Sequence, residues 1–191
     1  RWSLPSVVCY LLMATLMGSL LGEMGVDPLA AHLFIFYFGM MSMVTPPGAL
    51  AAYASASIAE APIMKTAFAA FRFSLVGFTL PFMFIYRPEL LLLNAQGGAA
   101  SIPLVILQTT MAIFGIHALA AGLAGYLRRP LELPMRIILF IAAALLLFPD
   151  SGMDVGGFPI YISDLVGLAI FVGAWLFLGK GKPAEPVPAA A

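Results

Sequence analysis

Two adjacent prolines, Pro46 and Pro47, interrupt a long apolar stretch, and this interruption constrains the fold more than any other feature of the sequence. Proline has no backbone N–H, so the carbonyls of Ser42 and Met43 lose the partners they would have in a helix. Thr45 precedes a proline and is pushed out of the helical region of backbone space. Because an orphaned polar group costs several kcal/mol in hydrocarbon, the break needs a specific environment.

We therefore expect Pro28–Ala59 to form a discontinuous helix. Its first half ends near Val44, Thr45–Gly48 forms a non-helical link, and the second half begins at Ala49. Such a break is tolerated where it is buried in protein or lines a wet cavity, and there a cation can take the freed carbonyls. A proline kink that only bends a packed helix is the alternative.

The composition places the chain in a lipid bilayer. Hydrophobic residues make up 62% of the 191 residues and charged residues 9%, and the mean hydropathy is +1.04. These values exclude a soluble globular domain and predict an all-α, polytopic membrane protein. The net charge of zero argues against a nucleic-acid partner, and the single cysteine, Cys9, supports no internal disulfide. No phosphate-binding loop and no paired catalytic residues occur, so we expect no enzyme activity.

The apolar runs define the other elements. In addition to the broken helix, the expected helices cover Pro5–Gly22, about Met64–Tyr86 with Pro81 inside it, Ile102–Leu127, Met135–Phe148 and Ile162–Leu178. The first of these is short for a full span and is expected to be one arm of a re-entrant hairpin. We divide the chain into residues 1–93, residues 94–179 with further membrane spans, and residues 180–191, a disordered cytoplasmic tail.

The positions of the basic residues predict the orientation in the membrane. The loop that carries Arg128, Arg129 and Arg136 is assigned to the cytoplasm, as is the tail with its two lysines. By alternation of the spans, Asn94–Ala100 then faces outward. The chain begins with Arg1 rather than Met and shows no signal peptide, so we expect it to be the C-terminal part of something larger.

Several segments carry a family resemblance: Pro28-Leu-Ala-Ala-His-Leu-Phe-Ile-Phe-Tyr-Phe-Gly39, Ser42 to Gly48 with its Thr-Pro-Pro, Ala51-Ala-Tyr53, Met64-Lys-Thr66, Phe71-Arg72, and Pro81-Phe82 through Tyr86-Arg-Pro88. From about Leu4 to Leu93 the chain resembles the large membrane subunit of tripartite ATP-independent periplasmic (TRAP) transporters in its fused permease form. Leu4–Tyr10 resembles the tip of that family's second hairpin, although Arg1 and Trp2 replace the usual glycines and Val7 replaces a hydroxyl residue.

The resemblance implies an elevator-type secondary transporter, in which two re-entrant hairpins and two broken helices hold sodium and substrate. It implies a multi-pass protein of the bacterial inner membrane, and a soluble periplasmic binding protein that delivers a small organic acid such as a C4-dicarboxylate. The first hairpin and its broken helix would belong to the missing N-terminal part of the permease. Sodium would be the coupling ion, and no other cofactor is expected.

The candidate site follows from the break. We place a cation on the carbonyls around Met41–Val44 with help from the Thr45 hydroxyl, and an anionic carboxylate at the positive N-terminal end of the second half-helix, near Gly48–Ala51. Ser6 either caps the hairpin helix or ligates a cation. The candidate ion- and substrate-binding residues are Ser6, Gly39, Met41, Ser42, Met43, Val44, Thr45, Pro46, Pro47 and Gly48, with sodium assigned to Ser42, Met43 and Thr45.

Other residues carry weaker signals. His32 and His117 lack a Cys, His, Asp or Glu at helical ligand spacing, so we expect packing or hydrogen-bonding roles and no metal beyond sodium. Two rivals to the transporter remain. One is a truncated membrane fragment that does not transport and acts only by packing against partner subunits. The other, an intramembrane enzyme, is disfavoured by the lack of paired catalytic residues.

Overall fold

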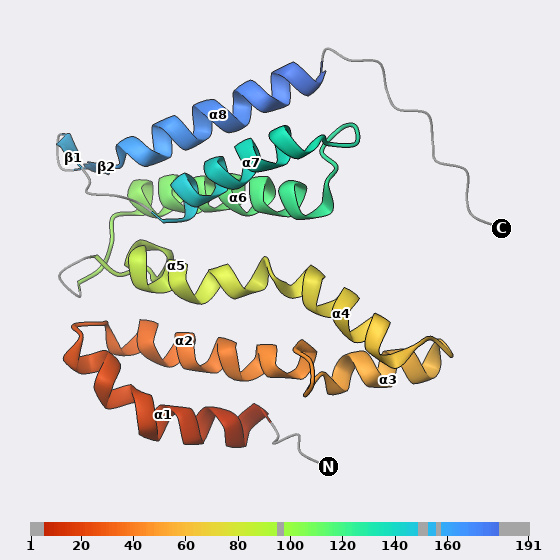
Figure 1. The fold of residues 1–191 in the computed structure, drawn as a ribbon. Helices are drawn as coiled ribbons and strands as arrows, with labels where there is room; N and C mark the ends of the chain where they lie inside the picture. Colours follow the sequence, from red (N-terminus) through yellow and green to blue (C-terminus); the bar gives the residue numbers. More distant parts are fainter. Residues whose placement is uncertain (1–5, 95–97, 149–152, 156–157, 180–191) are drawn as a thin grey trace. The chain divides into compact units, whose positions relative to one another are not determined.

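The computed structural model describes residues 6–94, 98–148, 153–155 and 158–179 of the chain. The predicted tail, residues 180–191, lies outside the described residues. The chain divides into two compact units, residues 1–105 and 106–191, and each is described by itself. Both units are built from helices, so the all-α fold class is confirmed (Figure 1). The modules predicted from composition stay predictions.

The first unit contains α1 (Ser6–Glu23), α2 (Pro28–Met41), the 3₁₀ turn η1 (Ser42–Val44), α3 (Leu50–Ile58), α4 (Ile63–Ser74), the 3₁₀ turn η2 (Gly77–Thr79), α5 (Leu80–Tyr86) and the 3₁₀ turn η3 (Pro88–Leu91). Helix α6 (Ile102–Ala124) begins in this unit and continues into the second one. The second unit also contains α7 (Leu133–Leu147), the strands β1 (Met153–Val155) and β2 (Phe158–Ile160), and α8 (Ile162–Gly179).

Helices α1 and α2 form a hairpin and lie side by side (Figure 1). Gly25 makes the turn with a φ of 80°, a backbone conformation that glycine adopts without strain. Asp27 then caps α2, because its carboxylate accepts the Leu29 N–H at 2.8 Å. The Tyr10 Oη lies 3.0 Å from the His32 Nδ1, which confirms the hydrogen-bonding role predicted for this histidine.

The sequence predicted one helix over Met64–Tyr86, but the structure has two helices here, α4 and α5, with η2 between them. The chain bends by 49° between α4 and the segment Gly77–Tyr86, and Pro81 lies in the first turn of α5, where its missing N–H costs nothing. The hydroxyls of the two residues that flank the bend bond to backbone carbonyls three positions earlier: Ser74 to Phe71 at 2.8 Å and Thr79 to Val76 at 2.7 Å. These bonds stabilise the interruption.

Aromatic rings join α2 to η2 and α5. Phe38 contacts Phe78 and Phe82 with ring centroids 5.8 and 5.7 Å apart, and Phe34 contacts Phe82 at 5.4 Å in an edge-to-face arrangement. Pairs of this kind contribute about 0.5–1.5 kcal/mol each beyond their burial. The aromatic run near the end of α2 therefore fixes the first half of the broken helix against α5.

The second unit packs through small residues. A Cβ at Gly115 would lie 2.8 Å from the Leu147 side chain, and one at Gly122 would lie 3.1 Å from the Phe140 ring. Glycine at these two positions thus leaves room for the side chains of α7 against α6. The ring of His117 packs against Phe171 and Trp175 of α8, as expected for a packing residue.

The strands β1 and β2 form a short antiparallel hairpin between α7 and α8, with Met153 opposite Ile160. Between the expected helices Met135–Phe148 and Ile162–Leu178, the sequence analysis above assigns no regular element. Gly156 and Gly157 stand between two short apolar segments, and a Gly-Gly pair in this position is a sequence signal for a hairpin.

Among the described residues, Ile102–Ala124 is the helix long and apolar enough to cross a membrane alone, and the bent pair from Ile63 to Tyr86 makes a second span if it is counted as one. The other apolar helices are shorter, for example Pro28–Val44 and Ile162–Leu178. The length of Pro28–Val44 fits a half-helix, which does not cross the whole hydrocarbon layer. The re-entrant hairpin itself stays a prediction.

Gly167 and Gly173 of α8 offer a matched test of the packing. A Cβ at Gly167 would lie 2.9 Å from Leu146 and 3.1 Å from the Ala142 carbonyl oxygen, whereas one at Gly173 would meet nothing within 4 Å. We expect Gly167→Ala to lower the free energy of unfolding by about 1–3 kcal/mol through overpacking. Gly173→Ala should raise it by up to about 1 kcal/mol through helix propensity. Thermal unfolding in detergent measures both, and equal effects would contradict the close α7–α8 contact.

Candidate ion-binding site at a helix break

The break between α2 and α3 lies where the two prolines are. Helix α2 ends at Met41, η1 adds one 3₁₀ turn, and Thr45 is extended with φ −100° and ψ 119°. Helix α3 begins at Leu50, and the Pro46–Pro47 peptide bond is cis. The discontinuous helix predicted from the sequence is confirmed, with its first half ending at η1 and its second half beginning one residue later than expected.

The N–H groups that are missing at Pro46 and Pro47 determine which carbonyls of the break lack a hydrogen-bond donor. Thr45 carries the last N–H before them and donates it to Ser42 at 3.4 Å, a long bond that replaces the lost helical one. The prediction that the Ser42 carbonyl stays without a partner is therefore corrected, because a 3₁₀ turn pairs residues three apart. For Met43, the N–H groups three and four positions later would both belong to prolines. Among the described residues, neither the Met43 carbonyl nor the Val44 carbonyl receives a hydrogen bond.

Two hydroxyl groups of the break donate their protons to carbonyls of α2. The Ser42 Oγ donates to the Gly39 carbonyl at 2.6 Å, and the Thr45 Oγ1 donates to the Met41 carbonyl at 2.7 Å. Both residues are half-buried. Because a hydroxyl has one proton and two lone pairs, each oxygen keeps acceptor capacity that can face a cation.

The link is folded back onto η1. Gly48 donates its N–H to the Thr45 carbonyl at 3.0 Å, and a Cβ at Gly48 would lie 3.6 Å from the Ser42 carbonyl oxygen. The Tyr53 hydroxyl of α3 donates to the Pro47 carbonyl at 2.6 Å. These contacts bring the start of the second half-helix next to the end of the first.

Helix α3 begins without a side-chain cap. Its N-cap residue is Ala49, which is fully buried and has no side chain that can accept an N–H. The N–H groups of Ala51 and Ala52 have no intrahelical acceptor, as in the first turn of any helix. Together with the helix dipole they make this end attractive to a negative group.

The second helix break contacts the first. A Cβ at Gly77 in η2 would lie 2.7 Å from the Cε of Met41, so glycine makes room for the methionine that ends α2. Sequence reasoning missed this second break and its contact with the site. The signal was present in Ser74, Gly77 and Thr79, which precede Pro81 within one or two helical turns.

The chemistry of the site is that of neutral oxygens. Residues 39–49 contain no ionisable side chain, and the part of the chain that the structure describes holds no group of three His, Cys, Asp or Glu residues suited to a metal ion. Backbone carbonyls and hydroxyls are hard ligands that suit an alkali cation.

The structure brings nine of the ten predicted site residues, Gly39 and Met41–Gly48, to the break and its flanks. Ser6 is the first residue of α1, and the placement of its side chain lies outside what the structure describes. The assignment of these residues to a bound ion stays a prediction.

Comparison with known families gives one match for this part of the chain. The family model described as "Tripartite ATP-independent periplasmic transporter, DctM component" matches residues 2–96. This range contains both helix breaks and ends before α6. No curated protein and no solved structure matches the chain.

The bond from Tyr53 to Pro47 is the test of the folded-back link. Tyr53→Phe leaves the Pro47 carbonyl without its donor, so we expect the free energy of unfolding to fall by about 0.5–1.5 kcal/mol. Tyr126→Phe is the matched control, because Tyr126 is exposed and its hydroxyl bonds to no described residue. Thermal unfolding of both variants checks the prediction, and equal stabilities would show that the link does not depend on this bond.

Proposed function

Since residues 2–96 match the family model of the DctM component of the tripartite ATP-independent periplasmic transporters, we propose that the chain is part of a permease of this family. In this proposal it acts in the bacterial inner membrane as a transporter and not as an enzyme. The permease imports a small organic acid, such as a C4-dicarboxylate, together with sodium.

The sodium site is proposed from two consecutive backbone carbonyls, those of Met43 and Val44. Neither receives a hydrogen bond among the described residues. With the hydroxyl oxygens of Ser42 and Thr45 they supply up to four neutral oxygen ligands on one turn of chain. A cation held there stabilises carbonyls that otherwise remain unpaired in an apolar surrounding. The C-terminal end of α2 adds the negative end of its dipole.

The substrate carboxylate fits the other end of the link. Helix α3 presents uncapped N–H groups at Ala51 and Ala52, and the fold of the link brings them close to η1. A cation and an anion bound at the two ends attract one another, so each raises the affinity for the other. This reciprocal effect couples the sodium gradient to uptake of the acid.

Two partners complete the proposal, and both rest on the family. A soluble periplasmic binding protein delivers the acid to the outer side of the permease. The N-terminal part of the permease supplies a first hairpin and a first broken helix, related to those of this chain by an inverted repeat.

The sodium site predicts a specific effect of Thr45→Val in the complete permease. Valine keeps the shape but removes a ligand oxygen, so we expect the sodium affinity to fall roughly tenfold or more, as for loss of a hydrogen bond to a charged group. Thr66→Val is the matched control, because the Thr66 hydroxyl also donates to a backbone carbonyl, that of Pro62 at 3.1 Å, away from the break. Uptake measured against sodium concentration separates the two variants.

The double substitution of Pro46 and Pro47 by alanine tests the same site from the backbone. It restores the two missing N–H groups, so the carbonyls are withdrawn into a helix and sodium-dependent uptake should be lost while the protein still inserts. Sodium at 100 times its dissociation constant should stabilise the parent by about 2.7 kcal/mol and leave the double variant unchanged. The same sodium dependence in parent and variant would favour a simple proline kink.

The binding protein is tested by reconstitution. We expect vesicles containing the complete permease to accumulate the organic acid only when the soluble binding protein is supplied on the outer side, because the acid reaches the permease through that protein. Radiolabelled uptake with and without the binding protein measures this. Uptake at full rate without it would overturn the delivery step, and no uptake under any condition would favour a structural fragment.

A further inference from the structure

Arg128 and Arg129 of the loop between α6 and α7, and Arg136 in the first turn of α7, have separate roles. Arg136 is half-buried and donates its Nε to the Gly122 carbonyl at 2.9 Å and an Nη to the Leu123 carbonyl at 3.4 Å. Its charge thus satisfies carbonyls at the C-terminal end of α6 and complements the dipole there. Arg128 lies over the Trp175 ring of α8, with its guanidinium carbon 4.2 Å from the ring centroid. Neither is the cation of the pocket described next.

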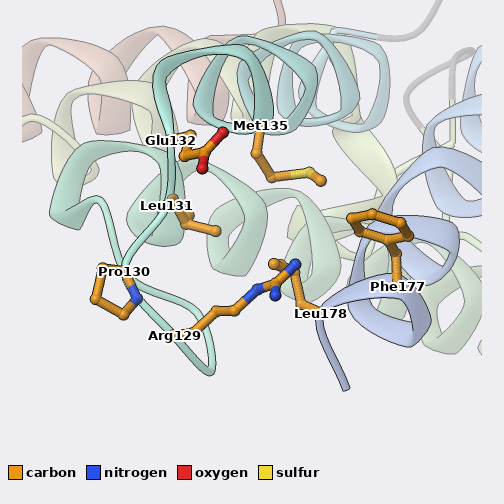
Figure 2. A pocket seen from close by; sticks show the side chains of 7 residues that line it. All are labelled: Arg129, Pro130, Leu131, Glu132, Met135, Phe177 and Leu178. Atoms are coloured by element: carbon orange, nitrogen blue, oxygen red, sulfur yellow. The ribbon is translucent and has the colours of Figure 1, made fainter. Parts of the chain in front are cut away.

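Arg129 lines a pocket between this loop and the end of α8. The pocket has a volume of about 350 Å³ and is lined by Arg129, Pro130, Leu131, Glu132, Met135, Phe177 and Leu178 (Figure 2). In Figure 2 the Arg129 guanidinium lies beside Leu178, while the Glu132 carboxylate lies toward Met135 of α7. The pocket therefore carries one positive and one negative group on otherwise apolar walls.

Neither of these charges is neutralised within the described part of the chain. The guanidinium carbon of Arg129 lies 5.7 Å from the centroid of the Phe177 ring, and no described carboxylate pairs with it. Glu132 is the N-cap residue of α7, yet its carboxylate accepts no helix N–H. Asp, Asn, Ser or Thr at this position normally accepts such an N–H, whereas the Glu132 carboxylate does not and remains available to a ligand.

The place of the pocket along the helices indicates the kind of ligand. It lies at one end of two apolar helices, α7 and α8, next to the arginine-rich loop that the positive-inside rule assigns to the cytoplasm. At that level of a membrane the lipid headgroups meet the hydrocarbon. Met135, Phe177 and Leu178 can contact the glycerol and upper acyl carbons, while the two charges face the headgroup.

We propose that this pocket binds the headgroup of a zwitterionic aminophospholipid, with phosphatidylethanolamine as the probe. Arg129 takes the phosphate through its fork of N–H donors, and the Glu132 carboxylate accepts N–H bonds from the primary ammonium. One cation and one anion complement a headgroup of net charge zero. A quaternary ammonium has no N–H to donate, and an anionic headgroup without an amine would be repelled by Glu132. The site lies beyond the matched residues 2–96 and does not depend on sodium transport.

The test is lipid competition on the purified, delipidated 191-residue chain, followed by native mass spectrometry. Equal amounts of phosphatidylethanolamine, phosphatidylcholine and phosphatidylglycerol with identical acyl chains are offered together. We expect phosphatidylethanolamine to bind about three- to fivefold better than phosphatidylcholine, as for one exposed ion pair. Equal binding of the three lipids, or a preference for phosphatidylglycerol, would overturn the proposal.

Two pocket variants separate the charges. Glu132→Gln should abolish the preference for phosphatidylethanolamine over phosphatidylcholine and raise binding of phosphatidylglycerol, whereas Arg129→Gln should weaken binding of all three. Arg129→Lys should retain most of the binding, which distinguishes loss of charge from loss of fold. Glu60→Gln, in an exposed turn, and Lys65→Gln, on the exposed first turn of α4, are matched controls outside the pocket, and they should change nothing.

Soluble phosphoethanolamine identifies the source of the ligand. At millimolar concentration it should not displace the lipid, because the apolar walls contribute to binding. Displacement would assign the pocket to a free phosphate ester and overturn the lipid assignment. Pocket variants that bind the three lipids like the parent would place the lipid contacts elsewhere on the protein.

Discussion

The structure of the first unit depends on the absence of a backbone N–H at Pro46 and at Pro47. Thr45 carries the last N–H before them, so the helix can tighten by one 3₁₀ turn but cannot pair the Met43 carbonyl. The Ser42 and Thr45 hydroxyls bond to carbonyls of α2, and the Tyr53 hydroxyl holds the link through the Pro47 carbonyl. The break is therefore a defined structure with its own hydrogen bonds.

The two halves of the broken helix are held by different kinds of packing. The first half is fixed by large rings, among them Phe34 and Phe38 against Phe82 of α5. The second half rests on α4 through a small cluster of Ala49, Ala52 and Ala67. Alanines allow close approach but bury little area, so α3 is the more weakly held of the two. A ligand at the link would bridge a firmly packed helix and a loosely packed one.

The sequence predicted those features whose cause is local. A proline lacks a backbone N–H wherever it occurs. The presence of Pro46 and Pro47 in the sequence was therefore enough to predict the break and the extended Thr45. The bend at Gly77 was missed because glycine and threonine permit a kink without requiring one. The bond from Tyr53 to the Pro47 carbonyl and the pocket at Arg129 depend on tertiary contacts. No periodicity in the sequence reports contacts of that kind.

The direction of the hydroxyl protons at Ser42 and Thr45 has a consequence for ion selection. Both hydroxyls donate their protons to carbonyls of α2, so each of them can offer only electron pairs to a ligand at the break. Residues 39–49 contain no ionisable side chain, so no side chain there can bind a proton in competition with a cation. We therefore expect any binding of an alkali cation at this break to depend little on pH.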